Sequence, residues 1–429
     1  MVNGDLAGAG PAPALARPPG AKPFAARPRA VLLVANSANP YSRTLRTARS
    51  LVEAGYDVEI AGVDESGVPR EERDGEIVIR RYVPEREARL TRLAGIHQAR
   101  QLFLWPEADR GWYRTLRRQV RPADLYHACG YRTVGVGLEL AAAARRQGRA
   151  GRVIYDVIDI QLETQAYARL PRLVRTIHAS RERSWIRAVD AVVTVNQPIA
   201  DHLARAWSLS ELPTVLLNCP PRWTPPAIRP THLRDLTGIP PERTVVLFIG
   251  KLNRERGLDE AAEAVLRLPD AAFVLMGFGA WADRLRERDR DPRFAGRHFT
   301  VPPVHPDAVP EWTASADVSI VAVPAKSLNQ RLVTPNKFWE SLTAGTPVVV
   351  GGELEVMREI LAADDLGASS DTDDPAGFAQ ALGSVLGRPA AERLAMRERC
   401  LRVAWDRYNW ETAVEPYLAL VRRLATPAA

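Results

Sequence analysis

The segment Thr334-Pro-Asn-Lys-Phe-Trp-Glu-Ser-Leu-Thr-Ala-Gly-Thr-Pro-Val-Val-Val350 decides the fold of this chain. It predicts a short helix that begins after Pro335, stops at a glycine and leads into a buried strand. The first amides of that helix, those of Asn336 and Lys337, have no partner within the helix and attract phosphate. Glu340 lies about one turn further in. Such an end can hold a nucleoside diphosphate, with the amides on the phosphates and the Glu340 carboxylate on a ribose diol. The alternative is an ordinary helix–strand unit with a surface glutamate.

Length and composition indicate a globular protein of two domains. The chain has 429 residues, of which 46% are hydrophobic and 25% charged, and domains typically have about 100–200 residues. Cys129, Cys219 and Cys400 lie far apart without metal-ligand spacing. They fit a reducing cytoplasm and predict neither disulfides nor a metal site. The formal charge of +7 favours acidic partners such as nucleotides, whereas the absence of a combined aromatic and basic platform argues against nucleic acid.

Strand and helix patterns alternate along both halves, which predicts an α/β fold with parallel sheets. The expected strands of the first half span 30–35, 57–63, 76–80, 125–128, 153–157 and 191–195, and its expected helices span 41–54, 134–147, 164–189 and 198–207. The expected strands of the second half span 244–249, 272–276, 298–301, 318–323 and 347–350, followed by helices at 375–386, 391–402 and 410–424.

This pattern divides the chain into two Rossmann-like, doubly wound domains. The expected parts are a disordered tail (1–28), an N-terminal domain (29–215), a proline-rich linker (216–241), a C-terminal domain (242–408) and a C-terminal helix (409–429) packing back toward the N-terminal domain. In such sheets ligands bind beyond the carboxyl ends of the strands, so we expect the site in the cleft between the domains.

Two glycine-rich turns of the second half carry the chemistry expected there. Gly250-Lys-Leu-Asn-Arg-Glu-Arg-Gly257 follows a buried strand and places Lys251 and Arg256 between glycines, as a cationic pyrophosphate clamp requires. The alternative is a polar turn with solvated charges. The next strand ends in a second turn, Gly277-Phe-Gly279.

Taken together, these segments resemble the family-4 retaining glycosyltransferases of the GT-B fold (glycosyl transferases group 1). The matching segments of the second half are Gly250-Lys251 with Arg256-Gly257, Gly277-Phe-Gly279, Ala316-Asp-Val318 and Glu340-Ser-Leu-Thr-Ala-Gly-Thr-Pro-Val-Val349. Those of the first half are Arg43 to Val58, Pro122-Ala-Asp-Leu-Tyr-His127, Tyr155-Asp156 with Asp159, and Val189-Asp-Ala-Val-Val-Thr-Val195. The resemblance covers about residues 30–425.

The resemblance implies an enzyme that moves a sugar from a nucleotide-sugar, with UDP favoured, to a hydroxyl acceptor in the biosynthesis of a natural product, glycolipid or polysaccharide. It implies that the N-terminal domain (29–215) binds the acceptor and that the C-terminal domain (242–408) binds the nucleotide-sugar. It also implies retention of anomeric configuration, and the two-cation clamp would make a metal ion or other cofactor unnecessary. Lys251, Arg256 and His127 are the expected catalytic residues. The expected donor-binding residues are Gly250, Gly277, Gly279, Asn336, Lys337 and Glu340.

Two positions depart from the family pattern. The family often has a second glutamate eight positions before Glu340, where this chain has Leu332. Sugar contacts must then come from elsewhere, and Lys326 and Asn329, with Gln330, are the candidates. Where many relatives have "H-x-H", this chain has His127-Ala-Cys129, so His127 is either a catalytic residue or an ordinary residue at a strand end.

Two other functions remain open at this point. A nucleotide-sugar epimerase would need acid and base groups in the cleft, and only His127 and His305 among seven histidines sit at expected strand ends. A non-catalytic GT-B binding module is the other alternative. We expect a cytoplasmic protein with at most peripheral membrane contact. The membrane contact is suggested by residues 86–121, which interleave apolar and arginine side chains as a helix lying on anionic lipid does. A basic, solvated helical insertion explains the same pattern.

Overall fold

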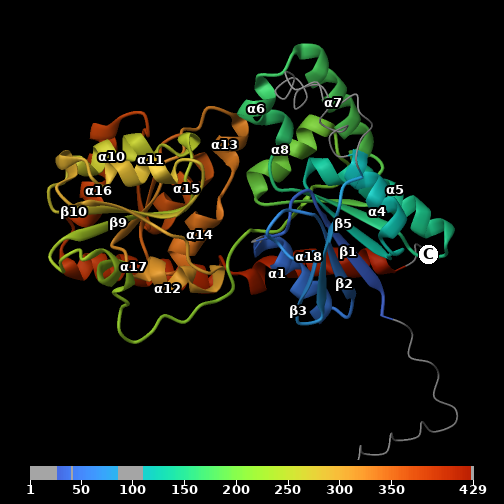
Figure 1. Ribbon diagram of the computed structural model, residues 1–429, viewed down its shortest axis with the longest axis horizontal. Helices are drawn as coiled ribbons and strands as arrows, with labels where there is room; N and C mark the ends of the chain where they lie inside the picture. Colours follow the sequence, from blue (N-terminus) through green and yellow to red (C-terminus); the bar gives the residue numbers. More distant parts are fainter. Residues whose placement is uncertain (1–26, 40–41, 86–109, 427–429) are drawn as a thin grey trace, which may run out of the picture.

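The computed structural model describes residues 27–39, 42–85 and 110–426. Two α/β domains lie side by side, each with a central sheet covered by helices (Figure 1). The predicted alternation is confirmed: every expected strand is present, with shifts of one or two residues at its ends.

The N-terminal sheet has the strand order β3-β4-β2-β1-β5-β6-β7-β8 among the described residues, and only the β3–β4 pair is antiparallel. Its strands are β1 (Arg29–Val34), β2 (Asp57–Val63), β3 (Glu71–Asp74), β4 (Ile77–Tyr82), β5 (Leu125–Cys129), β6 (Arg152–Val157), β7 (Ala191–Thr194) and β8 (Thr214–Val215). Its helices are α1 (Ser42–Glu53), α4 (Arg110–Gln119), α5 (Tyr131–Arg146), α6 (Gln165–Ala168), α7 (Arg172–Ile186) and α8 (Gln197–Trp207).

The C-terminal sheet is parallel throughout, in the order β11-β10-β9-β12-β13-β14. Its strands are β9 (Thr244–Lys251), β10 (Ala271–Phe278), β11 (His298–Val301), β12 (Val318–Val321), β13 (Val348–Gly351) and β14 (Gly367–Ser370). The helices of this half are α9 (His232–Thr237), α10 (Leu258–Leu266), α11 (Ala282–Arg288), α12 (Val309–Ala314), α13 (Leu328–Leu332), α14 (Asn336–Thr343), α15 (Glu355–Asp364), α16 (Pro375–Leu386), α17 (Ala390–Asp406) and α18 (Trp410–Ala425).

The last helix, α18, leaves the C-terminal half and runs beneath the N-terminal sheet (Figure 1). Its Trp410 and Tyr417 are buried in the same apolar cluster as Leu32 of β1. The amide of Trp410 donates a hydrogen bond of 2.8 Å to the Pro220 carbonyl, so the two segments that cross between the domains are tied together.

Three details differ from the sequence-based expectation. The single helix expected over 164–189 is two helices, because Pro171 caps α7 and cannot continue α6. The linker contains the short helix α9, whose Leu233 is buried. The glycine turns were expected as loops, yet Gly250 and Gly277 pair in register at the extended ends of β9 and β10.

One interpretation of the sequence of residues 86–121 is a helix that lies on a lipid surface. Residues 86–109 lie outside the described residues. In the part that is described, Trp112 and Leu116 of α4 are fully buried in the N-terminal core together with residues of α5 and β4, and this burial accounts for their apolar side chains. Within 27–39, 42–85 and 110–426, no helix combines the length and the apolar character needed to cross a bilayer.

Candidate functional site

A cleft of about 460 Å³ lies between the two domains. Its C-terminal wall comes from the ends of β9 and β10 and from the start of α14, and Ser42, Asp159 and Asn218 line the opposite wall. The cleft contains Gly250, Lys251, Arg256, Gly277, Asn336, Lys337 and Glu340 of the expected site residues. The fold thus brings together residues that are up to about ninety positions apart in the chain.

Glycine is required where the backbones at the cleft floor approach one another. A Cβ on Gly277 would lie 1.8 Å from the Gly250 carbonyl oxygen, and a Cβ on Gly279 would lie 2.3 Å from that of Leu252. Real Cβ atoms do not come so close to backbone atoms, so any side chain would push β10 away from β9. Gly279 itself is not part of the cleft lining, and its role here is to permit this approach.

The side chain of Lys337 is buried, which is unusual for a lysine. Its side chain is only 8% exposed, and its Nζ lies 3.5 Å from the centre of the Phe248 ring. Among the described residues this ammonium has no hydrogen-bond partner. Burial, reinforced by the nearby Arg256 charge and partly opposed by Glu340, lowers the pKa of Lys337 well below its usual value. A buried cation at the wall of a cleft and without a partner is suited to receive an anion.

The side chains of Lys251 and Arg256 and the first turn of α14 line the same cleft as Lys337. Lys251 is exposed at the end of β9, and Arg256 lines the cleft with a buried Nε that has no hydrogen-bond partner within the described chain. Helix α14 begins at Asn336, and Pro335 before it provides no side-chain cap for the first amides. These features place positive charge where the end of β9 and the start of α14 line the cleft.

Glu340 lies one turn inside α14, between the cleft and a second hollow of about 700 Å³ near α1. Burial raises the pKa of Glu340, and the charges of Arg46 and Lys337 oppose that shift. Its carboxylate is therefore at the edge of the cleft and within the field of two cations.

The side chain of Asn336 spans the domain boundary. Its Nδ2 donates a hydrogen bond of 3.1 Å to Ser42 Oγ, and its Oδ1 accepts one from Asn218 Nδ2. Its backbone amide remains at the start of α14, where the sequence predicted it. No local sequence signal marks Ser42 or Asn218 as cleft residues, because their roles depend on this contact between domains.

The candidate sugar contacts lie in different places. Asn329 is buried and bridges the domains: its Nδ2 donates to Asp159 Oδ1 at 3.0 Å, and its Oδ1 accepts from the Ile160 amide at 2.7 Å. Asn329 and Gln330 line a smaller hollow beside the cleft, whereas the exposed Lys326 lines neither space. The position of Lys326 thus gives it no contact with either space.

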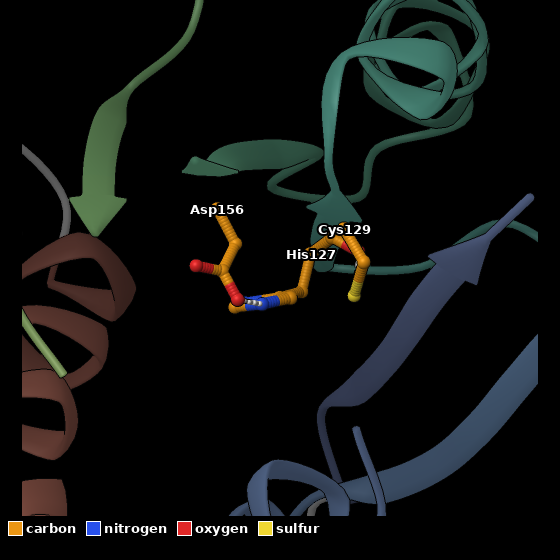
Figure 2. A group of neighbouring side chains, drawn as sticks. All are labelled: His127, Cys129 and Asp156. Carbon is orange, nitrogen blue, oxygen red and sulfur yellow. Dashed lines mark hydrogen bonds and ion pairs between the residues drawn. The ribbon is translucent and has the colours of Figure 1, made fainter. Parts of the chain in front are cut away.

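His127 is also corrected, because it is 1% exposed and does not line the cleft. Its Nε2 lies 3.2 Å from Asp156 Oδ2, and its Nδ1 lies 3.1 Å from the Tyr417 hydroxyl of α18 (Figure 2 shows His127 and Asp156). Arg43 donates two hydrogen bonds, of 2.8 and 2.9 Å, to the Asp156 carboxylate. Burial alone would raise the pKa of Asp156, but Arg43 and His127 lower it. His127 is thus a structural residue beneath α18.

His127, Cys129 and Asp156 have ligand atoms within 4.8 Å of one another, a spacing that a metal ion could use (Figure 2). The donor set fits a metal poorly, however. Arg43 already occupies both Asp156 oxygens and would repel a dication, and burial raises the pKa of the Cys129 thiol. A hydrogen-bonded network explains this cluster better than a metal centre.

Comparisons with known proteins agree with this geometry. Residues 243–388 match the family described as Glycosyl transferases group 1. A D-inositol 3-phosphate glycosyltransferase of Xylanimonas cellulosilytica is 30% identical over 244 residues, which cover 52% of this chain and 56% of that protein, or about half the length of each. A 2-deoxystreptamine N-acetyl-D-glucosaminyltransferase of Streptomyces fradiae is 27% identical over 72% of this chain and 74% of that protein.

Solved structures extend the likeness over nearly the whole chain. Sucrose-phosphate synthase from Thermosynechococcus elongatus superposes with a TM-score of 0.66 at 18% identity, covering 93% of this chain and 99% of that one. The Anabaena protein HepE in complex with UDP-glucose has a TM-score of 0.66 at 14% identity, covering 92% and 100%. This chain therefore has the GT-B fold, and residues 243–388 in its C-terminal half match the glycosyl transferases group 1 family.

Proposed function

We propose that this protein is a glycosyltransferase that transfers a sugar from a nucleoside-diphosphate sugar to a hydroxyl acceptor. The observation that carries the proposal is the buried Lys337 ammonium, which lines the interdomain cleft and has no hydrogen-bond partner within the described part of the chain. A diphosphate is the ligand that fits these groups best, because its negative charge would neutralise Lys337, Lys251 and Arg256 together.

The cleft also has a place for the rest of the nucleotide. Glu340 lies about one turn beyond the start of α14 and lines the cleft, where its carboxylate would accept hydrogen bonds from a ribose diol. Met276, Phe278 and Val304 give the cleft apolar surface, which suits the face of a base. We favour UDP, with support from structural neighbours that were solved with UDP and UDP-glucose; a starch synthase among the neighbours binds ADP.

The reaction would break the bond between the anomeric carbon and the diphosphate. The three cations would stabilise the negative charge that develops on the leaving group, which is the usual largest contribution of an enzyme to such a step. The N-terminal domain would hold the acceptor hydroxyl close to the anomeric carbon. We further propose retention of configuration, with a diphosphate oxygen accepting the proton of the acceptor, and no requirement for a metal ion or other cofactor.

An epimerase is disfavoured because His127, one of its two possible acid–base histidines, is buried away from the cleft. We place the activity in the cytoplasm, with at most peripheral membrane contact; three cysteines without disulfide partners support a reducing compartment.

A thermal-shift panel of UDP, GDP, ADP and dTDP tests the binding step, because a ligand that binds only the folded state raises the unfolding midpoint. Release of the nucleoside diphosphate from the matching nucleotide-sugar then tests catalysis. Stabilisation by one diphosphate together with turnover supports the proposal. Stabilisation without turnover, with or without added sugar and polyol acceptors, would favour a non-catalytic binding module.

A further inference from the structure

Two apolar side chains are exposed on the outer face of α7, the face made of Arg172, Leu173, Thr176, Ile177, Ser180 and Arg183. Leu173 and Ile177 lie one turn apart and are 72% and 50% exposed. The other side of the helix is buried, through residues spaced four apart: Val174, His178, Glu182 and Ile186. Figure 1 shows α7 on the side of the N-terminal domain that lies away from α18. The outer face thus presents aliphatic side chains at the surface of the molecule.

The segment that contains α7 is strongly basic. Residues 164–188 include six arginines and a single acidic residue, Glu182. Glu182 is 1% exposed and accepts a hydrogen bond of 2.7 Å from the Tyr155 hydroxyl, so it does not neutralise the surface. None of the six arginines forms an ion pair with another residue that the structure describes: Arg169, Arg172, Arg175, Arg181, Arg183 and Arg187.

Arginines on other surface helices of this chain are paired with carboxylates. On α4, Arg117 and Arg118 pair with Glu139 and Glu85, and two arginines of α11 pair with Asp259. The charge of α7 has no such counterpart and attracts anions from outside the chain. Exposed aliphatic side chains flanked by arginines are typical of a helix that lies in the interface of a membrane.

We infer that the outer face of α7 docks on an anionic phospholipid surface, with Leu173 and Ile177 entering the boundary between headgroups and acyl chains and the arginines contacting lipid phosphates. The unpaired positive charge opposes contact between this face and the same face of a second copy. Docking goes beyond the proposed function, because it requires neither a nucleoside diphosphate nor turnover. It also uses a different surface from residues 86–121, of which the described Trp112 and Leu116 are buried.

Co-sedimentation of the full chain with lipid vesicles tests the docking. One set of vesicles contains phosphatidylglycerol and phosphatidylcholine in equal parts, and the other contains phosphatidylcholine alone. The parent should bind the anionic vesicles and not the neutral ones. Binding should weaken as salt rises from about 0.1 to 1 M, because the Debye length falls from about 10 to 3 Å over that range.

Two variants separate the charged part of the face from the apolar part. Arg172→Gln/Arg183→Gln/Arg187→Gln should weaken binding to anionic vesicles about 100-fold, at about fivefold for each arginine removed. Leu173→Ser/Ile177→Ser should weaken it about tenfold, because less apolar surface enters the lipid. All five side chains are exposed, so both variants should unfold at the midpoint of the parent.

Leu394→Ser/Arg402→Gln is the matched control on α17. Leu394 is 58% exposed, and Arg402 is exposed and has no ion pair with a described residue. This variant should bind vesicles as the parent does.

Three results would overturn the inference: no binding of the parent to anionic vesicles, equal binding to neutral ones, or the same loss in the control as in the α7 variants. A parent that dimerises in sedimentation velocity without binding vesicles, and a monomeric Leu173→Ser/Ile177→Ser variant, would instead assign the face to self-association. Each of these results leaves the proposed function intact as long as the parent binds a nucleoside diphosphate.

Discussion

Replacing Lys337 by methionine separates what this residue does for the fold from what it does for a ligand. The buried ammonium lies over Phe248 and has no partner among the described residues. A buried charge without a hydrogen-bond partner costs free energy of folding, and even buried ion pairs can often be replaced by apolar side chains at no cost or with a gain of about 1–4 kcal/mol. Lys337→Met should therefore unfold at the same temperature as the parent or at a higher one.

The same substitution should weaken diphosphate binding strongly. A hydrogen bond to a charged group contributes about 1.5–3 kcal/mol, which corresponds to a loss of about 10- to 100-fold in the affinity for UDP. Uridine, which has no phosphate, should lose little. Calorimetry with both ligands makes the measurement, and Lys326→Met, a change at an exposed lysine outside the cleft, is the control. Unchanged UDP affinity in a folded Lys337→Met protein would refute the reasoning.

The pKa of Lys337 gives this prediction a pH dependence with a definite sign. The folded pKa lies well below the usual 10.5, so between the two values the unfolded chain binds more protons than the folded one. Stability of the parent therefore rises with pH in that interval. The advantage of Lys337→Met should shrink as pH rises through the lowered pKa toward 10.5. Binding of a diphosphate should take up protons in the same pH interval, because the ligand favours the charged form of Lys337. Calorimetry in two buffers of different ionisation enthalpy should detect this uptake in the parent and not in Lys337→Met.

The remaining predictions concern the clamp, the ribose contact and the buried histidine. Lys251→Ala and Arg256→Ala should each reduce UDP affinity while leaving uridine affinity nearly unchanged, as titration would show; losses of equal size for both ligands would exclude a phosphate contact. Glu340→Gln should weaken donor binding, and 2′-deoxyuridine diphosphate should lose less in this variant than UDP does; additive losses in that double-mutant cycle would argue against a ribose contact. His127→Gln should lower the unfolding midpoint, because Asp156 and Tyr417 lose their shared partner, but folded protein should keep its turnover number. A large fall in that number without loss of stability would restore a catalytic role.

Much of the fold was predictable because its signals are local. Buried parallel strands are apolar runs, and the proline before Asn336 and the glycine at 345 mark the ends of α14 in the sequence itself. The glycines at the cleft floor were recognisable for the same reason, although they lie at strand ends rather than in loops.

The errors and omissions depend on contacts that are distant in the chain. His127 looked like a cleft residue, yet Tyr417, which is 290 positions away, covers it when α18 returns to the N-terminal sheet. The contact between Asn336 and Ser42 spans 294 positions. The backbone amide of Lys337 was expected near a phosphate, but the burial of its ammonium over the Phe248 ring of β9 follows only from the tertiary packing. No local pattern carries this information.

The most direct test of the account is a crystal structure of the parent protein with the nucleoside diphosphate that stabilises it most. The account predicts the diphosphate at the start of α14, with a phosphate oxygen within hydrogen-bond distance of Lys337 Nζ and the ribose beside Glu340. A nucleotide bound elsewhere, or one in the cleft with Lys337 Nζ still without a partner, would contradict it.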